Sequence, residues 1–196
     1  RFSLTAKRAG MKVGFPVDAR YGWNLKNQEH RKMLDKCFDR FSPGVLLSAP
    51  DCRIWSRSSN RLDPFEKEKQ RVLERPWLEW LQQKNKLLVD KGNGYINENP
   101  VGSDIFRESP LFHNESLPDY RKPQRGDQCL HGAKDERGMP IEKGTLFDTN
   151  LRLKKAALRC RDPMKQHGVP HAQLQGRAPG SPGNRTAMAA CYPKKL

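Results

Sequence analysis

Apolar side chains recur at helical spacing near the start of the chain. Residues 28–41 place an apolar stripe along one face of an amphipathic helix, with charged residues on the other faces. The stripe consists of Met33, Leu34, Cys37, Phe38 and Phe41. Residues 4–9 predict the end of an earlier helix, because Gly10 follows them and glycine is a common stop signal. Cys37 is therefore expected in the core.

Short apolar runs next to these helices predict strands. Residues 11–17 form one run and end at Asp18, and residues 45–47 form a second run with the length and composition of a buried strand. Residues 95–97 predict a third strand, which ends at Glu98. Strands that alternate with helices are typical of a parallel sheet. The predicted fold class is α/β.

A long charged stretch before the third strand predicts a helix in two pieces. Residues 63–74 are highly charged, Pro76 interrupts the pattern, and residues 77–91 resume it with an apolar stripe. Trp77 and Trp80 belong to that stripe. We therefore expect this tryptophan pair to pack in the core rather than to stack on nucleic-acid bases.

Loops and basic residues dominate the second half of the chain. Residues 109–125 contain three prolines and predict a long excursion on the substrate side, whereas residues 143–150 predict a strand and 151–159 a short helix. The chain is therefore divided into a core of residues 1–108 and a loop-rich basic region of residues 109–196 within the same domain.

The charge balance favours a polyanionic partner. Lys and Arg number 37 against 22 Asp and Glu, which gives a formal net charge of +15. Nucleic acid is the commonest partner of such a chain, although ribosomal, chromatin and simply basic proteins share the signature. No apolar run is long enough to span a membrane, and no secretory signal opens the sequence. The first residue is Arg, as in a processed or excised segment.

Cysteine usage points to a reducing compartment. The five cysteines are scattered and odd in number, and no export signal accompanies them. Reduced thiols in the nucleus or the cytoplasm are expected, and secretion is not.

A thiol and a carboxylate follow two of the predicted strands. Cys52 comes just after residues 45–47, in a turn that Pro50 stiffens, and Glu98 ends the strand 95–97 with a proline two residues on. Ligands of open α/β sheets bind beyond the carboxyl ends of the strands. The two side chains would face the same crevice if the strands are neighbours, which suggests covalent chemistry with acid assistance. The alternative is that Cys52 is an ordinary small buried residue.

Two further groups of polar residues have candidate binding roles. Asp18 ends the predicted strand 11–17, where a carboxylate can accept the hydrogen bonds of a cofactor ribose, although aspartates are common at strand ends. The arginines and hydroxyl groups that follow Cys52 suit a phosphate-lined groove, with Trp55 among them. These DNA-binding candidates are Arg53, Ser56, Arg57 and Arg61. A solvated basic loop is the alternative interpretation of this stretch.

A cysteine and two histidines near residue 165 have the spacing of metal ligands. Six residues separate Cys160 from His167, and three separate His167 from His171. The His-x3-His spacing occurs in zinc sites, and either Cys129 or His131 could supply the fourth ligand. Ordinary polar packing or substrate contact is the alternative.

The order of these motifs resembles a known enzyme family. Asp18, the segment Pro50-Asp51-Cys52-Arg53-Ile54-Trp55-Ser56 and the segment Glu98-Asn99-Pro100 resemble the motifs of the DNA cytosine-5 methyltransferases. Further short motifs resemble the methyltransferase-like domains embedded in retrotransposon polyproteins of dinoflagellates and other protists. These motifs are Arg1-Phe2-Ser3, Gly22-Trp23-Asn24-Leu25, Asp127-Gln128-Cys129, Phe147-Asp148-Thr149-Asn150 and Tyr192-Pro193.

The resemblance implies a fold, a chemistry and a cofactor. The fold is a partial Rossmann-like sheet with helices on both faces, whose first strand and glycine-rich loop would precede Arg1. Cys52 would add to a flipped cytosine, Glu98 would hold the ring, and S-adenosylmethionine, with Asp18 and Pro50 beside it, would supply the methyl group. DNA and the remainder of a polyprotein are the implied partners.

Departures from the family pattern leave other functions open. Asp51 stands where the family has proline, and a carboxylate beside the thiol disfavours the thiolate. The Gln-x-Arg-x-Arg strand of the family has only imperfect stand-ins at Gln124-Arg125 and at residues 127–131. The rival hypothesis is a non-catalytic nucleic-acid-binding remnant. Residues 48–51 also resemble, less well, the Asp-Pro-Pro-Tyr turn of amino-methyltransferases.

Overall fold

The chain forms two compact units that divide between Ser42 and Pro43. The structure is a computed structural model that describes residues 6–172, apart from the side chains of Arg57 and Ser58. The first unit contains a 3-10 turn, η1 (Ala19–Tyr21), and one amphipathic helix, α2 (Gln28–Phe41). The second unit contains the sheet and the remaining helices.

The first unit confirms the predicted helices but not the predicted strand. The Asn27 side chain caps α2 by accepting a hydrogen bond from the Glu29 backbone, and helix 28–41 has the predicted bounds. Residues 6–8 are helical, and Gly10 follows with a positive φ. Residues 11–17, however, form no strand. Their apolar side chains are largely exposed, and the described chain offers them no strand to pair with.

The apolar stripe of α2 is less buried than its pattern predicts. Leu34 is buried and Cys37 is half-buried, whereas Met33 and Phe41 are exposed. The expectation that Cys37 belongs to the core is therefore only partly met. Periodicity indicates which residues share a helix face, but it does not show how much of that face is covered.

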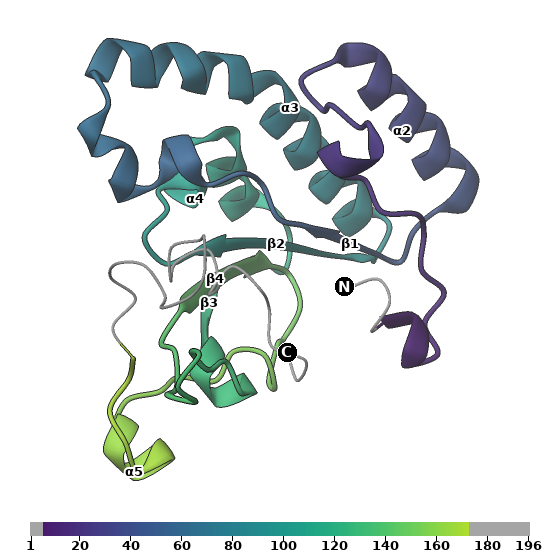
Figure 1. Ribbon diagram of the computed structural model, residues 1–196. Helices are drawn as coiled ribbons and strands as arrows, with labels where there is room; N and C mark the ends of the chain where they lie inside the picture. Colours follow the sequence, from purple (N-terminus) through teal and green to yellow (C-terminus); the bar gives the residue numbers. More distant parts are fainter. Residues whose placement is uncertain (1–5, 173–196) are drawn as a thin grey trace. The chain divides into compact units, whose positions relative to one another are not determined.

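The second unit is built on a four-stranded sheet (Figure 1). Its strands are β1 (Val45–Ser48), β2 (Gly94–Pro100), β3 (Arg121–Asp127) and β4 (Gly144–Thr149), in the order β1-β2-β4-β3. β1 and β2 are parallel, whereas β4 runs antiparallel to both of its neighbours. The fold class is α/β as predicted, but the sheet is mixed rather than parallel.

The connections between the strands explain the mixed sheet. A parallel pair needs a crossover, and a long helix supplies it between β1 and β2. A loop of residues 128–143 returns the chain from β3 to β4, and this allows the antiparallel pair. β1 lies at the edge of the sheet, and its Val45 and Leu47 side chains are exposed, so the prediction of a buried strand here is wrong.

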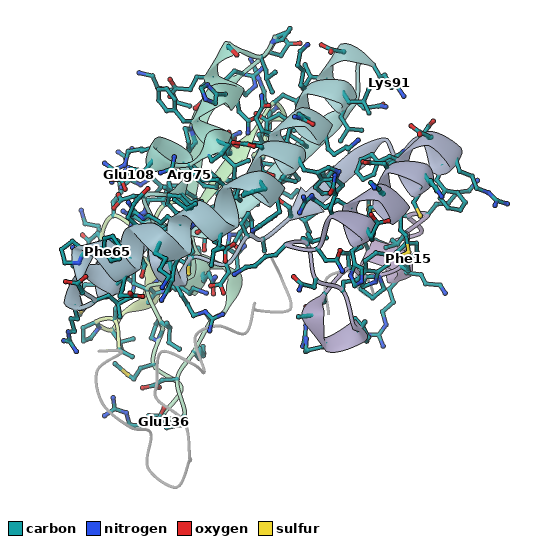
Figure 2. The ribbon with its side chains drawn as sticks, turned by 90° about the horizontal axis from the view of Figure 1, so that it is seen from above. Phe15, Phe65, Arg75, Lys91, Glu108 and Glu136 are labelled. Atoms are coloured by element: carbon teal, nitrogen blue, oxygen red, sulfur yellow. The ribbon has the colours of Figure 1, made fainter. Side chains whose placement is uncertain are left out.

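One long helix, α3 (Pro64–Asp90), covers β1 and β2 (Figure 1). Asp63 caps it, and Pro64 occupies its first turn, where a missing N–H is harmless. The helix continues through Pro76, so the predicted break is wrong. Figure 2 shows this helix from above, with Phe65 near its start and Lys91 just after its end.

The core lies between α3 and the sheet. Trp77, Leu78, Leu81 and Leu88 are buried on the helix, and Tyr95 is buried on β2. Trp77 is therefore a core residue as predicted, whereas Trp80 is only half-buried. α4 (Ile105–Glu108) packs against η4 (Pro110–Ser116), and η4 packs against α3. Within residues 6–172, no helix is both long and apolar enough to cross a membrane.

The predicted excursion and the predicted helix after β4 both need correction. Residues 109–125 contain η4 and much of β3 rather than one long loop. Residues 151–159 form a single turn within irregular chain, and the next helix is the short α5 (Pro163–His167). The Gln124 side chain binds Leu151 and Leu153 through their backbone groups, so this stretch satisfies its hydrogen bonds against β3 rather than within a helix.

Candidate functional site

The carboxyl ends of β1 and β2 lie side by side and carry Cys52 and Glu98. The two strands pair in parallel up to Ser48 and Asn97, whose side chains form a 2.6 Å hydrogen bond. Just beyond, the Asn99 amide donates to the Pro50 carbonyl oxygen at 2.9 Å. The turn that carries Cys52 is therefore tied to the last residues of β2, the strand that contains Glu98, so both candidate catalytic groups lie at the same edge of the sheet.

Three charged groups act on the Cys52 thiol. Burial raises the pKa of Cys52, and Asp51 and Glu98 raise it further, whereas Lys143 lowers it. Glu98 is itself buried, with 8% of its surface exposed. The thiol and Glu98 are thus within electrostatic reach of each other, but the net effect disfavours the thiolate, as Asp51 led us to expect.

Lys143 is the residue of this site that sequence reasoning missed. It lies in the loop between β3 and β4, more than 90 residues after Cys52, and no local motif marks it. Its influence on the thiol arises only when the strand order brings the start of β4 next to the end of β2. The effect of Lys143 on Cys52 can therefore be found only from the tertiary structure.

The residues after Cys52 form two short 3-10 helices, η2 (Arg53–Trp55) and η3 (Arg57–Arg61). Arg53 is exposed but pairs with the Asp51 carboxylate, with its Nε atom 2.8 Å from Oδ2. Ser56 donates its hydroxyl to the Arg53 carbonyl oxygen. Trp55 is fully buried beneath the Arg71 guanidinium, so its expected place in a binding groove is wrong. Arg61 is exposed, and the side chain of Arg57 lies outside the described part of the chain.

Asp18 and Pro50 are both engaged within the protein. The Asp18 carboxylate caps η1 and accepts three hydrogen bonds from Arg20, which lower its pKa to about 2. It follows irregular chain rather than the expected strand. Pro50 is buried, and its carbonyl oxygen accepts the bond from Asn99.

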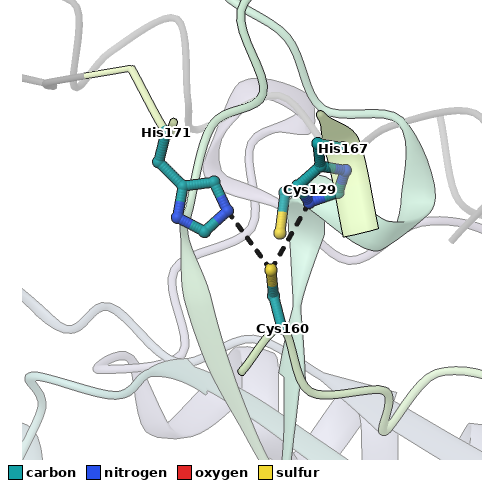
Figure 3. A group of neighbouring side chains, drawn as sticks. All are labelled: Cys129, Cys160, His167 and His171. Carbon is teal, nitrogen blue, oxygen red and sulfur yellow. Dashed lines mark hydrogen bonds between the residues drawn. The ribbon is translucent and has the colours of Figure 1, made fainter. Parts of the chain in front are cut away.

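Two cysteines and two histidines meet beside the β3–β4 hairpin (Figure 3). Cys129 comes from η5 (Gln128–His131), His167 from α5, and Cys160 and His171 from the irregular chain on either side of α5. Their ligand atoms all lie within 4.8 Å of one another, and the Cys160 sulfur is 3.4 Å from Nε2 of each histidine. These four residues form a candidate metal-binding cluster, which we call the Cys/His cluster.

The structure decides between the two candidates for the fourth ligand. Cys129 belongs to the cluster, whereas the ring of His131 forms a 3.2 Å hydrogen bond with the Ala156 carbonyl oxygen. Two sulfur and two nitrogen ligands are a set that zinc commonly takes in tetrahedral structural sites. Burial raises the pKa of the Cys129 thiol to about 12, which a coordinated cation would reverse.

Charged side chains surround the Cys/His cluster. Glu142 binds Nδ1 of His171 at 3.0 Å, which leaves Nε2 directed at the cluster. The same carboxylate pairs with Arg125, and Arg125 pairs with the buried Asp127. Asp127 in turn accepts a hydrogen bond from the Cys160 backbone. Carboxylates that orient metal-binding histidines in this way are typical of metal sites.

A buried carboxylate lies on β4, opposite Asn97 of β2. Asp148 accepts hydrogen bonds from the side-chain amides of Asn97 and Asn114, at 2.8 and 2.7 Å. Burial raises its pKa from 3.8 to about 6, and the hydrogen bonds oppose that shift. The sequence gives no warning of this, because the aspartate sits in an ordinary strand pattern.

Comparison with known proteins identifies no relative. No family model matches the chain, and neither a curated protein nor a solved structure does. The functional argument therefore rests on the geometry of the two sites and on the short motifs.

Proposed function

We propose that this chain is a DNA cytosine-5 methyltransferase-like domain of the retrotransposon type and that its second unit captures the target base. The observation that supports this best is the Asn99–Pro50 hydrogen bond, because it holds the turn of Cys52 against the end of β2, where Glu98 lies. A nucleophile and an acid from two neighbouring strand ends are the parts that addition to a pyrimidine ring requires.

The proposed capture is a reversible addition to the ring. The Cys52 thiolate forms a bond to carbon 6 of a cytosine that has left the base stack, while Glu98, in its protonated form, donates to the ring nitrogen. The electron pair of the broken double bond moves to carbon 5, which takes a proton from solvent. Loss of a proton from carbon 5 then expels the thiolate and restores cytosine.

The residue expected to hold the cofactor ribose makes its contacts within the protein. S-adenosylmethionine is the methyl donor that the resemblance implies, and Asp18 was expected to hold its ribose. The Asp18 carboxylate is instead occupied by Arg20 and by its own turn. The proposal therefore covers capture of the base, with DNA and the remainder of a polyprotein as partners in the nucleus or cytoplasm, and it includes no methyl-transfer step.

A non-catalytic nucleic-acid-binding domain is the second candidate function. The environment of Cys52 favours it, because burial and Asp51 raise the pKa of the thiol that capture requires. The formal charge of +15 would still attract phosphates. The two candidates differ in whether Cys52 reacts with a base.

We also propose that zinc is the metal of the Cys/His cluster. The two sulfur and two nitrogen ligands leave no ligand position open for substrate, so this zinc would be structural rather than catalytic. Elemental analysis of the purified protein should find about one zinc per chain. Cys160→Ser should lose it.

Exchange of the carbon 5 hydrogen tests base capture without any cofactor. Duplex DNA carrying tritium at carbon 5 of cytosine should release it to water with the wild-type protein, because each round of addition and elimination replaces that hydrogen. Cys52→Ser should release none, whereas Cys37→Ser, which alters a thiol in the other unit, should behave as wild type. Equal release by wild type and Cys52→Ser would refute capture and favour the binding function.

A further inference from the structure

Residues 151–172, which we call the basic segment, have almost no core of their own. None of their side chains is buried, and their only regular element is the five-residue helix α5. A stretch of this length cannot hold itself in place by apolar burial. Something else must hold it.

Hydrogen bonds of the backbone hold residues 151–160 of the basic segment against β3. The Asp127 backbone N–H donates to the Leu158 carbonyl oxygen at 2.8 Å, and the Asp127 carboxylate accepts from the Cys160 N–H at 2.9 Å. Gly126 lets β3 and the basic segment approach each other closely, since a Cβ at this position would lie 2.1 Å from the Ala156 carbonyl oxygen. These contacts reach only as far as Cys160.

The Cys/His cluster holds the rest of the basic segment. Cys160, His167 and His171 all belong to the segment, and Cys129 belongs to the hairpin side. His171 is joined to Glu142 as well, and the next residue, Ala172, donates its N–H to the Pro140 carbonyl oxygen. A metal bound here would therefore join the segment to the hairpin, and its binding energy would become folding energy for the segment.

The basic segment carries a concentration of exposed cations. Arg152, Lys154, Lys155, Arg159 and Arg161 are all exposed, and no ion pair involves any of them within residues 6–172. Among the Lys and Arg side chains of the segment, Lys165 alone is paired, with Asp162 at 3.9 Å. By contrast, Arg53, which the sequence pointed to, is neutralised by Asp51. Cations without carboxylate partners are available to an external anion.

We infer that the basic segment, fixed by zinc in the Cys/His cluster, is the surface that binds nucleic-acid phosphates. This inference rests on the zinc and the nucleic-acid partner proposed above, but not on base capture. Nucleic acid fits better than a membrane surface. Three of the five unpaired cations are arginines, whose planar forks match phosphate oxygens, and α5 is too short to form the apolar face of an interfacial helix.

Removal of the metal is the first arm of the test. Zinc-free protein, prepared with a chelator, should become sensitive to trypsin within residues 151–172 and should bind duplex DNA at least tenfold more weakly; added zinc should reverse both effects. Glu142→Gln should weaken zinc binding by about 10- to 100-fold, as loss of such a carboxylate does elsewhere. Glu136→Gln, an exposed acid of the same loop, should not. Equal tryptic protection and DNA affinity with and without zinc would overturn the inference.

Charge neutralisation is the second arm. Lys154→Gln with Lys155→Gln should reduce the slope of log K against log salt by about 2, since each phosphate contact contributes roughly 0.9. Lys69→Gln with Lys86→Gln removes the same charge from α3, where both lysines are already paired, and should leave the slope unchanged. Equal effects of the two pairs would overturn the inference, as would tighter binding to phosphatidylserine vesicles than to DNA. If base capture fails but zinc-dependent DNA binding remains, only the catalytic proposal is refuted.

Discussion

Cys52 is held between charges of opposite sign. Asp51 raises the pKa of its thiol and Lys143 lowers it, and these residues come from different parts of the chain. Burial does most to raise this pKa, and the two charges adjust how much thiolate exists near neutral pH. Replacing either charged residue by an uncharged one should therefore change the reactivity of the Cys52 thiol. The sign of the removed charge gives the direction of that change.

Asp51→Asn should make Cys52 more reactive. Loss of the carboxylate lowers the thiol pKa and also releases Arg53 from its ion pair, so alkylation by iodoacetamide at pH 7.5 should accelerate by up to roughly tenfold for a one-unit decrease in pKa. Lys143→Gln should slow the alkylation of Cys52, because Lys143 lowers the pKa of the thiol. Reactivity is measured at Cys52 by mass spectrometry of peptides, with Cys52→Ser as the blank. Slower alkylation of Asp51→Asn would contradict this account of the site.

Asp148 should make the fold more stable as the pH falls toward 4. Its pKa is about 6 in the folded protein and 3.8 as the ordinary value, so the folded state binds the proton more tightly. The carboxylate therefore costs stability above pH 6, and protonation relieves that cost as the pH falls through 6 toward 4. The difference of about two pKa units corresponds to about 3 kcal/mol.

Asp148→Asn isolates this contribution. The amide oxygen can still accept from Asn97 and Asn114, and the charge is gone, so the variant should unfold at higher urea than wild type at pH 7.5 and at similar urea near pH 4. Asp39→Asn, an exposed position on α2, is the control. A variant that is less stable than wild type at pH 7.5 would show that the charged form is favoured in the fold.

At the scale of elements, the close approach of β3 and the basic segment depends on one glycine. Gly126→Ala would place a methyl group against the Ala156 carbonyl oxygen, and such overpacking typically costs about 1–3 kcal/mol. We expect weaker protection from hydrogen exchange at the Asp127 and Cys160 amides. Gly102→Ala, where a Cβ would meet nothing within 4 Å, is the matched control. Unchanged exchange in Gly126→Ala would show that the segment does not dock on β3 as described.

The elements that the sequence predicts well are those with a strong local signal. Helix 28–41 has both an apolar stripe and a capping Asn27, and its bounds are confirmed. Residues 11–17 have the composition of a strand, but a strand also needs a partner, which no local pattern supplies. The antiparallel direction of β4 likewise depends on the loop before it. Pro76 looked like a break, yet packing of the apolar face of α3 carries the helix through it.

The candidate sites likewise combine residues with a local sequence signal and residues that only the fold brings together. The spacing of Cys160, His167 and His171 indicated three of the four candidate ligands, because these residues lie close together in the sequence. The choice of Cys129 over His131, the orienting role of Glu142 and the effect of Lys143 all depend on the β3–β4 hairpin. Ligands are visible in a sequence when they are neighbours along the chain, whereas their supporting residues seldom are.

At the scale of the whole molecule, both sites belong to the second unit. The sheet from β1 to β4 carries Cys52 and Glu98 at one edge and the Cys/His cluster beside its hairpin. The proposed division of labour is that the zinc-held basic segment binds phosphates while Cys52 and Glu98 engage the base. The first unit contributes neither group, and its Asp18 carboxylate is paired with Arg20.

Covalent trapping tests the central claim most directly. Duplex DNA that carries 5-azacytosine offers a ring whose carbon 6 accepts a thiolate readily, so wild-type protein should form a complex that survives denaturing electrophoresis. Cys37→Ser should form it too, whereas Cys52→Ser should not. A stable complex with wild type and none with Cys52→Ser is the result that this account predicts. The same faint or absent band with both proteins would show that Cys52 does not capture a base.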